Sequence, residues 1–323
     1  MLSLGACGSD EGGGSEGAAS LPEPTEATLV LDFVPNAVHT GIYCALERGY
    51  YERANVELEI VEPTSTSDTL KLIDQGRASF GLADAIDVGE QIGRGLDATA
   101  IMAVVQRPLG GVITLRDSGI RSPRGLEGKT VGVTGVPSDE AVLDTVVSAD
   151  GGDPGAVDMV TIGFNTIIAL ESRRVDAITG YPPADATQIE LQGRSTSSFR
   201  LDHWGGPRYP GLLVFSTKAA IERNPELMQA FTDATVRGYE DTLDDPRRCL
   251  DALLDQVPEI NPELARAQLD AYVPLFKAGA GGYGSLDRAA IAGLLGFLRE
   301  TSLVEKPISP RRYATNEFVR DPR

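Results

Sequence analysis

The sequence predicts an α/β protein with mostly parallel sheets flanked by helices and divided into two lobes. From Thr28 onward, short apolar runs alternate with stretches of helical apolar spacing, as in β–α–β units. Beyond Thr217 the pattern becomes helical only. The chain has 323 residues, of which 41% are hydrophobic, so two lobes can each bury a core.

Apolar runs of strand length and helical spacings follow one another in a regular order. Strands are predicted at residues 28–33, 56–61, 78–82, 99–105, 111–116, 130–133, 157–162, 177–180 and 212–216. Helices are predicted between them at residues 38–48, 67–75, 85–93 and 138–149. Later helices are predicted at 225–241, 245–256, 262–271 and 286–301, several of them beginning with Pro or Asn-Pro.

The chain is expected to pass between the lobes twice. Lobe one would comprise residues 27–110 and 212–323, and lobe two residues 111–211. The crossings fall near Gly110-Gly111 and Pro210-Gly211, where glycine can absorb a hinge rotation. This organisation is that of a two-lobe periplasmic-binding-protein fold (type II), in which the lobes close around a ligand.

The net charge limits the partners. The chain carries 29 basic and 47 acidic residues, a net charge of −18. A protein this acidic repels nucleic-acid backbones and anionic lipid surfaces, so nucleic acid is not an expected partner. No stretch of the body is apolar over 18 residues, which argues against a membrane span there. We expect a monomer that binds a small molecule.

The N-terminal residues suggest a lipid anchor. Leu4-Gly5-Ala6-Cys7 has the form of a bacterial lipobox, although only six residues precede Cys7. The following Gly-, Ser- and Glu-rich stretch has the composition of a flexible tether. Residues 1–26 are therefore interpreted as a lipoprotein signal remnant and tether. Lipidation of Cys7 would place the protein outside the cytoplasm, attached to the bacterial cell membrane.

The other two cysteines and the histidines indicate no metal site. Cys44 and Cys249 lie in apolar helical patterns and are expected to be small buried residues, with a disulfide between them left open. The chain has no Cys-x-x-Cys motif and two histidines, so zinc is not predicted.

Several turns between a strand and a helix carry polar side chains. Such joins are where ligands bind on open α/β sheets. Two of the helix N-termini already carry carboxylates, Asp139 and Glu140 at one and Asp68 and nearby Glu62 at the other. This favours a neutral or cationic ligand over an anion. The turns supply the candidates Asn36, His39, Tyr43, Thr64, Ser65, Thr66, Gly135 and Ser138. For Ser67, Asp68 and Ser138, each taken alone, the sequence favours helix capping over ligand contact.

A pair of carboxylates and several aromatic rings suggest the shape of the ligand. Asp84 and Asp87 are neighbours on one face of a starting helix, where they are suited to accept hydrogen bonds from an amino-heterocycle. Capping by Asp84 with a solvated Asp87 is the alternative interpretation. General acid–base chemistry is a third, but the sequence has no nucleophile motif, metal cluster or phosphate loop to support it. Flat rings in a cleft stack on flat ligands. The remaining candidates are Gln106, Phe164, Asn165, Tyr181, Trp204 and Tyr209.

Five segments carry a resemblance to a known family. They are the opening at residues 31–51 with its Pro-Asn-x-x-His-Thr-Gly motif, and residues 76–82, 119–133, 209–214 and 313–318. They resemble the NMT1/THI5-like family of ABC-transporter substrate-binding proteins, in its thiamine pyrimidine-precursor-binding branch. The resemblance implies an ABC permease as partner and a hydroxymethyl- or formylaminomethyl-pyrimidine as ligand. It also implies that Asn36, His39, the Asp84–Asp87 region and an aromatic wall face that ligand.

The family also contains pyrimidine synthases that consume their own pyridoxal phosphate. The resemblance places Ala83 and Asp87 where those enzymes have a Lys and a His, and residues 210–215 lack the cysteines of their iron motif. A Schiff base needs an amine and iron ligation needs thiolates, and neither is present at these positions, so the sequence predicts no enzyme and no cofactor.

Alternative ligands for the binding protein are riboflavin or another flat heterocycle. A sulfonate or nitrate binder fits the carboxylate-bearing turns less well.

Overall fold

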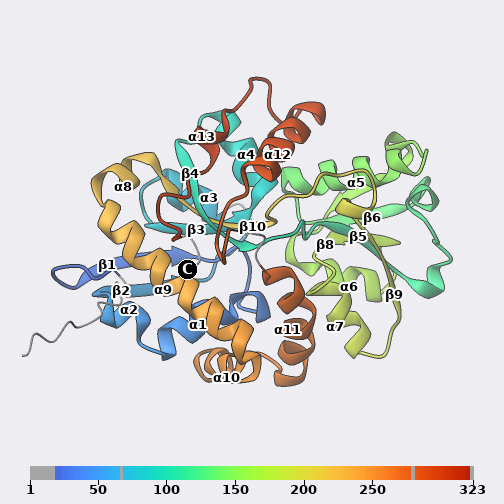
Figure 1. Cartoon of the computed structure of the whole chain (residues 1–323). Helices are drawn as coiled ribbons and strands as arrows, with labels where there is room; N and C mark the ends of the chain where they lie inside the picture. Colours follow the sequence, from blue (N-terminus) through green and yellow to red (C-terminus); the bar gives the residue numbers. More distant parts are fainter. Residues whose placement is uncertain (1–18, 66–67, 278–280, 321–323) are drawn as a thin grey trace, which may run out of the picture.

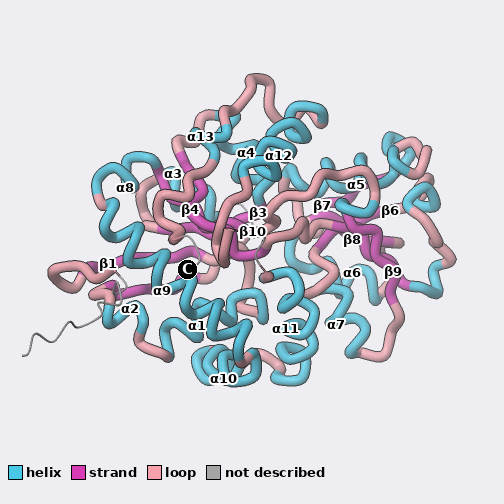
Figure 2. Tube along the Cα trace, viewed as in Figure 1, coloured by secondary structure: helices cyan, strands magenta, loops and turns pink. Residues whose placement is uncertain are grey.

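Two five-stranded sheets form the framework of the protein. The computed structural model describes residues 19–65, 68–277 and 281–320. Sheet A has the strand order β2-β1-β3-β10-β4 and sheet B the order β7-β6-β8-β5-β9. Figures 1 and 2 show the two sheets lying side by side with helices packed around each. The strands of sheet A are β1 (Thr25–Val30), β2 (Val56–Val61), β3 (Phe80–Asp84), β4 (Ala98–Val105) and β10 (Leu212–Thr217).

The second sheet is built from the middle of the chain. Its strands are β5 (Gly111–Leu115), β6 (Thr130–Val133), β7 (Asp158–Thr161), β8 (Ala177–Gly180) and β9 (Thr196–Arg200). The chain thus enters sheet B between β4 and β5 and returns to sheet A between β9 and β10. We call the part around sheet A lobe one and the part around sheet B, residues 111–211, lobe two.

Helices cover both sheets. Those of lobe two are α5 (Pro137–Ala149), α6 (Thr166–Glu171) and α7 (Asp185–Leu191). Those of lobe one are α1 (Thr40–Glu47), α2 (Tyr50–Arg53), α3 (Asp68–Asp74), α4 (Ala85–Arg94), α8 (Lys218–Arg223), α9 (Pro225–Asp244), α10 (Pro246–Gln256), α11 (Pro262–Phe276), α12 (Arg288–Glu300) and α13 (Pro310–Tyr313).

The α/β class with mostly parallel sheets is confirmed, because four strands of each sheet run in one direction and one strand, β10 or β5, runs against them. Strand β1 runs parallel to β2 and β3, and β6 runs parallel to β7 and β8. Strand β10 is antiparallel to both β3 and β4, and β5 is antiparallel to both β8 and β9. Each antiparallel strand is the one that follows a passage between lobes. It therefore enters its sheet without the helical crossover that makes neighbours parallel.

Element ends differ from the prediction. Strand β1 ends at Val30 rather than at residue 33, which leaves Asp32 and Phe33 in the loop that follows. Strand β9 was not predicted, because its sequence TSSFR is mostly polar. Helix α11 continues to Phe276, five residues beyond the predicted end, with Pro274 inside it. The longer helix brings additional side chains to the space between the lobes.

Tight helix packing and a disulfide hold lobe one together. Helices α1 and α9 approach so closely at Gly41 and Gly238 that a Cβ added to Gly238 would lie 2.0 Å from the Gly41 carbonyl oxygen. Cys44 in α1 and Cys249 in α10 are buried, as predicted, and they form a disulfide.

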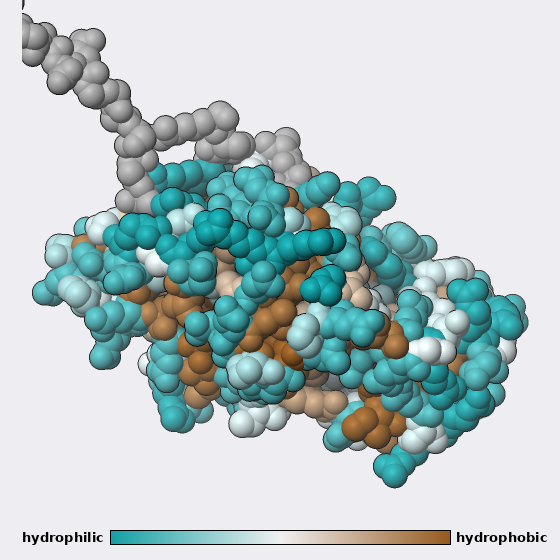
Figure 3. Space-filling model, turned by 90° about the horizontal axis from the view of Figure 1, so that it is seen from below, coloured by the Kyte–Doolittle hydropathy of each residue, from teal (hydrophilic) through white to brown (hydrophobic). Residues whose placement is uncertain are grey.

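Among the described residues, no helix combines the length and apolarity that a membrane crossing requires. The face seen in Figure 3 is mostly hydrophilic, with hydrophobic residues gathered near its middle.

Candidate functional site

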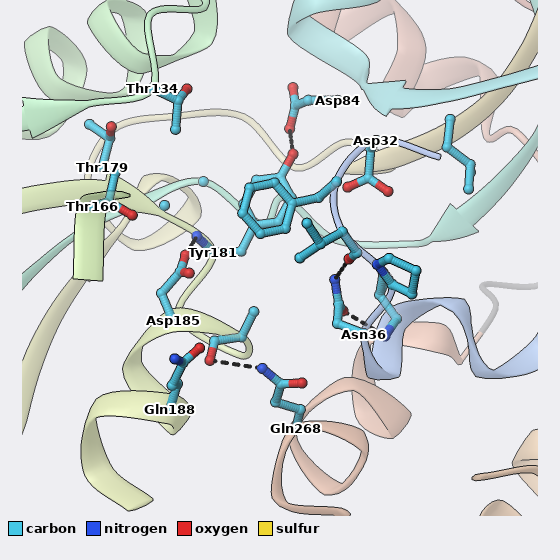
Figure 4. Close-up of a pocket in the computed structure, with 18 of the residues that line it drawn as sticks. Asp32, Asn36, Asp84, Thr134, Thr166, Thr179, Tyr181, Asp185, Gln188 and Gln268 are labelled. Carbon is cyan, nitrogen blue, oxygen red and sulfur yellow. Dashed lines mark hydrogen bonds between the residues drawn. The ribbon is translucent and has the colours of Figure 1, made fainter. Parts of the chain in front are cut away.

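A cavity of about 550 Å³ lies between the two lobes. Lobe one contributes the loop after β1, the β3–α4 junction and α11, and lobe two contributes the start of α5 and the β8–α7 segment. Figure 4 shows how side chains from these elements surround one space, with the Tyr181 ring in its middle. The volume is that of a typical small-molecule site.

The cavity is lined by many carboxylates. Seven acidic residues line it, and among its described lining residues there is no lysine, arginine or histidine. Carboxylates accept hydrogen bonds and attract positive charge, whereas an anion would find no cationic partner among these side chains. The acidic residues are Asp32, Glu62, Asp84, Asp87, Asp139, Asp185 and Glu259.

Asp84 ends β3 and caps α4. One carboxylate oxygen accepts a hydrogen bond from the Ile86 backbone N–H at 2.8 Å, and the other accepts one from the Tyr181 hydroxyl at 3.2 Å. Burial raises the pKa of Asp84 to about 7, although both hydrogen bonds oppose this shift. The two predicted roles of this residue, as a helix cap and as part of the cavity, are therefore combined in one side chain.

Asp87 contacts lobe two directly. Its two oxygens accept hydrogen bonds from the backbone N–H and from the hydroxyl of Ser138, each at 3.0 Å. Burial, followed by the nearby charge of Asp84, raises the pKa of Asp87 well above its usual value. The solvated Asp87 of the capping alternative is thus wrong, because only 7% of this residue is exposed.

Two acidic residues of lobe two organise its own loops. Asp139 accepts hydrogen bonds from the backbone of Gly135 and Val136 and from the hydroxyls of Thr134 and Thr179. Asp185 accepts one from the Tyr181 N–H at 2.7 Å, and burial raises its pKa to about 6. These carboxylates fix the backbone just before α5 and α7, where Asp139 takes the third helical position, as in a capping box.

The loop after β1 contains an ordered Asp–His pair. Asn36 caps the short helix η1 (Ala37–His39) by accepting a hydrogen bond from the Val38 N–H. The Asn36 N–H donates to Nδ1 of His39 at 3.1 Å. On the other side of the ring, Nε2 lies 2.8 Å from a carboxylate oxygen of Asp32. Since a backbone N–H can only donate, Nδ1 is the acceptor and Nε2 carries the proton given to Asp32.

Apolar and aromatic side chains line the rest of the cavity. The rings of Phe33, Tyr181 and Tyr272 take part in the lining. Phe33 also meets Phe164 of lobe two edge-on, with ring centroids 4.4 Å apart. The aliphatic lining includes Val34, Val38, Leu82, Val136, Val142 and Leu264. Flat rings beside acceptor groups suit a flat ligand that carries hydrogen-bond donors.

Five of the predicted site residues line the cavity: Asn36, Asp84, Asp87, Ser138 and Tyr181. His39, Phe164 and Gly135 lie one contact behind it, through Asp32, Phe33 and Asp139 respectively. Thr66 lies outside the described residues.

The other predicted residues lie elsewhere. Trp204 packs against Phe199 of lobe two, with ring centroids 6.2 Å apart, so its predicted place in the aromatic wall is not where the structure puts it. Tyr43 and Tyr209 are buried, and Gln106 donates to the Ser285 carbonyl. Asn165 is exposed, and Thr64 donates to Asp68 in a loop shared with Ser65.

Some lining residues were not predicted. Asp32 and Phe33 were placed inside a strand that ends earlier, and Gln268 and Tyr272 lie on a helix whose apolar pattern gave no sign of a site. Gln188 and Asp185 lie on a short helix that the sequence did not reveal. In the part of the chain that the structure describes, no group of three or more His, Cys, Asp or Glu side chains is arranged to hold a metal ion.

Comparison with known proteins agrees with the motifs of the opening segment. A family model described as NMT1/THI5 like matches residues 36–249. A formylaminopyrimidine-binding protein of Halalkalibacterium halodurans is 30% identical over 285 residues, which cover 87% of this chain and 86% of that protein. The chain belongs to the NMT1/THI5-like family.

The proteins to which this chain is similar have different functions in their names. A 4-amino-5-hydroxymethyl-2-methylpyrimidine phosphate synthase of Legionella pneumophila is 28% identical, over 78% of this chain and 80% of the enzyme. Among solved structures, the alkanesulfonate-binding protein SsuA of Xanthomonas axonopodis pv. citri has a TM-score of 0.73 at 16% identity, covering 91% of this chain and 99% of SsuA. The last likeness shows the periplasmic-binding-protein fold and, at this identity, nothing about the ligand.

Proposed function

We propose that this NMT1/THI5-like protein is the extracytoplasmic substrate-binding lipoprotein of an ABC importer. Its ligand would be a planar amino-pyrimidine precursor of thiamine, a hydroxymethyl- or formylaminomethyl-pyrimidine, held in the cavity between the lobes. The observation that carries this proposal is the acidic cavity, with seven carboxylates and no cationic side chain among its described lining residues. The name of the Halalkalibacterium relative supports the same class of ligand.

The charge of the cavity also separates this ligand from those of the structural relatives. A sulfonate or nitrate needs donors or cations, and two helix N-termini of the cavity are already served by Asp84 and Asp139. An amino-pyrimidine instead offers an exocyclic NH2 to the carboxylates and a flat face to Phe33 and Tyr181. We therefore expect an amino-heterocycle to bind and an alkanesulfonate to be rejected.

The cavity also lacks what the synthases of the family require. A Schiff base with pyridoxal phosphate needs a lysine amine, and none is present among the described residues that line the cavity. Ala83 lines it at the position where the resemblance places that lysine. We propose that the chain is not an enzyme. A Schiff-base absorbance band after addition of pyridoxal phosphate would contradict this.

A location outside the cytoplasm has independent support. The Cys44–Cys249 disulfide is of a kind that persists in oxidising compartments. Cys7, the proposed site of lipidation, lies outside the described residues. Metabolic labelling with a palmitate analogue tests the anchor: the wild-type protein should be labelled, and Cys7→Ser should not. An ABC permease would be the membrane partner of the monomer.

Ligand-induced stabilisation tests the proposed class of ligand. A molecule that binds only the folded state raises the melting temperature, and the stabilisation grows with the logarithm of the ratio of its concentration to its Kd. We expect hydroxymethyl- and formylaminomethyl-aminopyrimidine to raise the melting temperature, and an alkanesulfonate to leave it unchanged. Stabilisation by riboflavin but by neither pyrimidine would keep the importer role and replace the ligand.

A further inference from the structure

The amino edge of the ligand needs a carboxylate oxygen that no protein group has already taken. Asp84 and Asp87, which the sequence suggested for this role, use both oxygens on Ile86, Tyr181 and Ser138. Both oxygens of Asp139 are likewise engaged by groups of lobe two. Glu62 and Glu259 are exposed, so water competes for them. Asp32 and Asp185 are the lining carboxylates that remain.

Asp32 differs from Asp185 in how it is held. One oxygen of Asp32 accepts from Nε2 of His39, and its second oxygen has no donor among the described residues. His39 is completely buried, and its Nδ1 is fixed by the Asn36 N–H, so the ring cannot turn away from Asp32. The carboxylate is therefore orientated before a ligand arrives, which lowers the entropic cost of binding.

The surroundings of Asp32 fit a flat, amino-bearing ligand. Phe33, the next residue, turns its ring to the same cavity, so one loop supplies a stacking face and an acceptor. Figure 4 shows the Asp32 carboxylate pointing into the space beside the Tyr181 ring. Asp185 instead accepts from the backbone of Tyr181, within lobe two, and has no partner comparable to His39.

We propose that Asp32 is the carboxylate that reads the amino group of the pyrimidine, with His39 as the positioning residue behind it. This rests on the proposed function and assigns its specificity to one side chain. The free oxygen of Asp32 accepts from the exocyclic NH2, while His39 holds the other oxygen. A ligand with a carbonyl in place of the amino group would set two acceptors against each other and bind weakly.

The test measures the selectivity between an amino-pyrimidine and its oxo analogue. A merely structural role of Asp32 would leave this selectivity unchanged. By calorimetry, the wild-type protein should prefer 4-amino-5-hydroxymethyl-2-methylpyrimidine over its 4-oxo analogue by at least about tenfold. Asp32→Asn should reduce this ratio by about tenfold or more, because the amide N–H can face the oxo group. His39→Ala should lower the affinity, and His39→Gln, which keeps a donor near Asp32, should restore most of it. The surface variant Asp117→Asn should bind as the wild type does.

The same variants identify the results that would overturn the proposal. An unchanged ratio in folded Asp32→Asn, or a collapse of the ratio in Asp185→Asn instead, would remove the role of Asp32. Asp32→Ser gives a second test should Asn disturb folding. A wild-type protein that binds neither pyrimidine would overturn the proposed function itself, and this is seen before any variant is made.

The histidine can be tested without a ligand. The chain has two histidines, His39 and His203, so ¹⁵N NMR of labelled protein can be assigned with a single His203→Gln variant. We expect His39 in the tautomer with Nε2 protonated and Nδ1 unprotonated, and we expect the Nε2 signal to change in Asp32→Asn. A proton on Nδ1 would contradict the arrangement.

Discussion

The Tyr181 hydroxyl of lobe two donates a hydrogen bond to the Asp84 carboxylate of lobe one, at 3.2 Å. Ser138 donates two further hydrogen bonds from lobe two to Asp87, one from its backbone N–H and one from its hydroxyl, each at 3.0 Å. The lobes are thus joined by hydrogen bonds to two buried carboxylates at the wall of the cavity. We expect ligand affinity to depend on these bonds as well as on contacts with the ligand.

Removing the bonds between the lobes should weaken ligand binding. Tyr181→Phe and Ser138→Ala each delete one hydroxyl that donates to a buried carboxylate. A hydrogen bond of this kind is worth about 1 kcal/mol, so each change should lower the affinity about fivefold. Ser172→Ala is the matched control, since that hydroxyl bonds within its own helix segment. Equal affinities of all three variants in calorimetry would show that the lobe contacts do not support binding.

Asp84→Asn should change the pH dependence of stability. Burial raises the pKa of Asp84 from 3.8 to about 7. Between these two pH values the folded state therefore binds more protons than the unfolded state. The contribution of this group to stability therefore falls as the pH rises from about 4 to about 7. Asparagine cannot ionise and caps helices equally well, so the variant should melt at a higher temperature than wild type at pH 8.

The advantage of Asp84→Asn should shrink at pH 5, where the wild-type carboxyl keeps its proton. Asp150→Asn provides a control of opposite sign, because a hydrogen bond from Ser122 lowers the pKa of Asp150. That variant should gain nothing at pH 8. Melting curves in which Asp84→Asn loses stability between pH 5 and pH 8 relative to wild type would refute the assigned shift.

Breaking the disulfide should destabilise lobe one. Cys44 and Cys249 are 205 residues apart in sequence, and cross-links over long loops typically stabilise by about 2–4 kcal/mol. Cys44→Ser with Cys249→Ser should lower the denaturation midpoint, and reduction of the wild type should act similarly. Cys7→Ser, which leaves the pair intact, should not. Two reactive thiols from Cys44 and Cys249 in unfolded, unreduced protein would show that the bond does not form.

Fluorescence of Trp204 should respond little to ligand. This residue is the single Trp of the chain, and it packs on Phe199 rather than lining the cavity. A better reporter is Phe164→Trp in a Trp204→Phe background, because Phe164 contacts the cavity-lining Phe33 across the lobes. Its emission should shift on titration with hydroxymethyl-aminopyrimidine. A strong response from Trp204 and none from the new tryptophan would reverse this assignment.

The sequence predicted the strands of both sheets with one exception, because apolar runs bounded by turns are a local signal. It did not predict that β5 and β10 are antiparallel, since strand direction depends on how the chain passes between lobes. Strand β9 was not predicted because its own sequence is mostly polar, and it forms a strand through its pairing with β5.

The candidate site was predictable where function and local chemistry coincide. Asp84 and Asp87 follow a strand end, and the structure places both at the cavity. Asp32 was missed because the end of β1 was placed three residues too late. Trp204 was misplaced because a loop position does not show whether a ring faces a cleft or, as here, a neighbouring ring. These outcomes depend on packing between distant segments, which a local pattern does not contain.

The most direct test of the account is calorimetric titration of the delipidated protein. The ligands are hydroxymethyl-aminopyrimidine, its formylaminomethyl analogue, thiamine, riboflavin and an alkanesulfonate. The acidic, aromatic cavity predicts micromolar or tighter binding of at least one of the two pyrimidines and no heat of binding from the alkanesulfonate. Binding of the alkanesulfonate with silence from both pyrimidines would contradict the central claim that this cavity recognises an amino-pyrimidine.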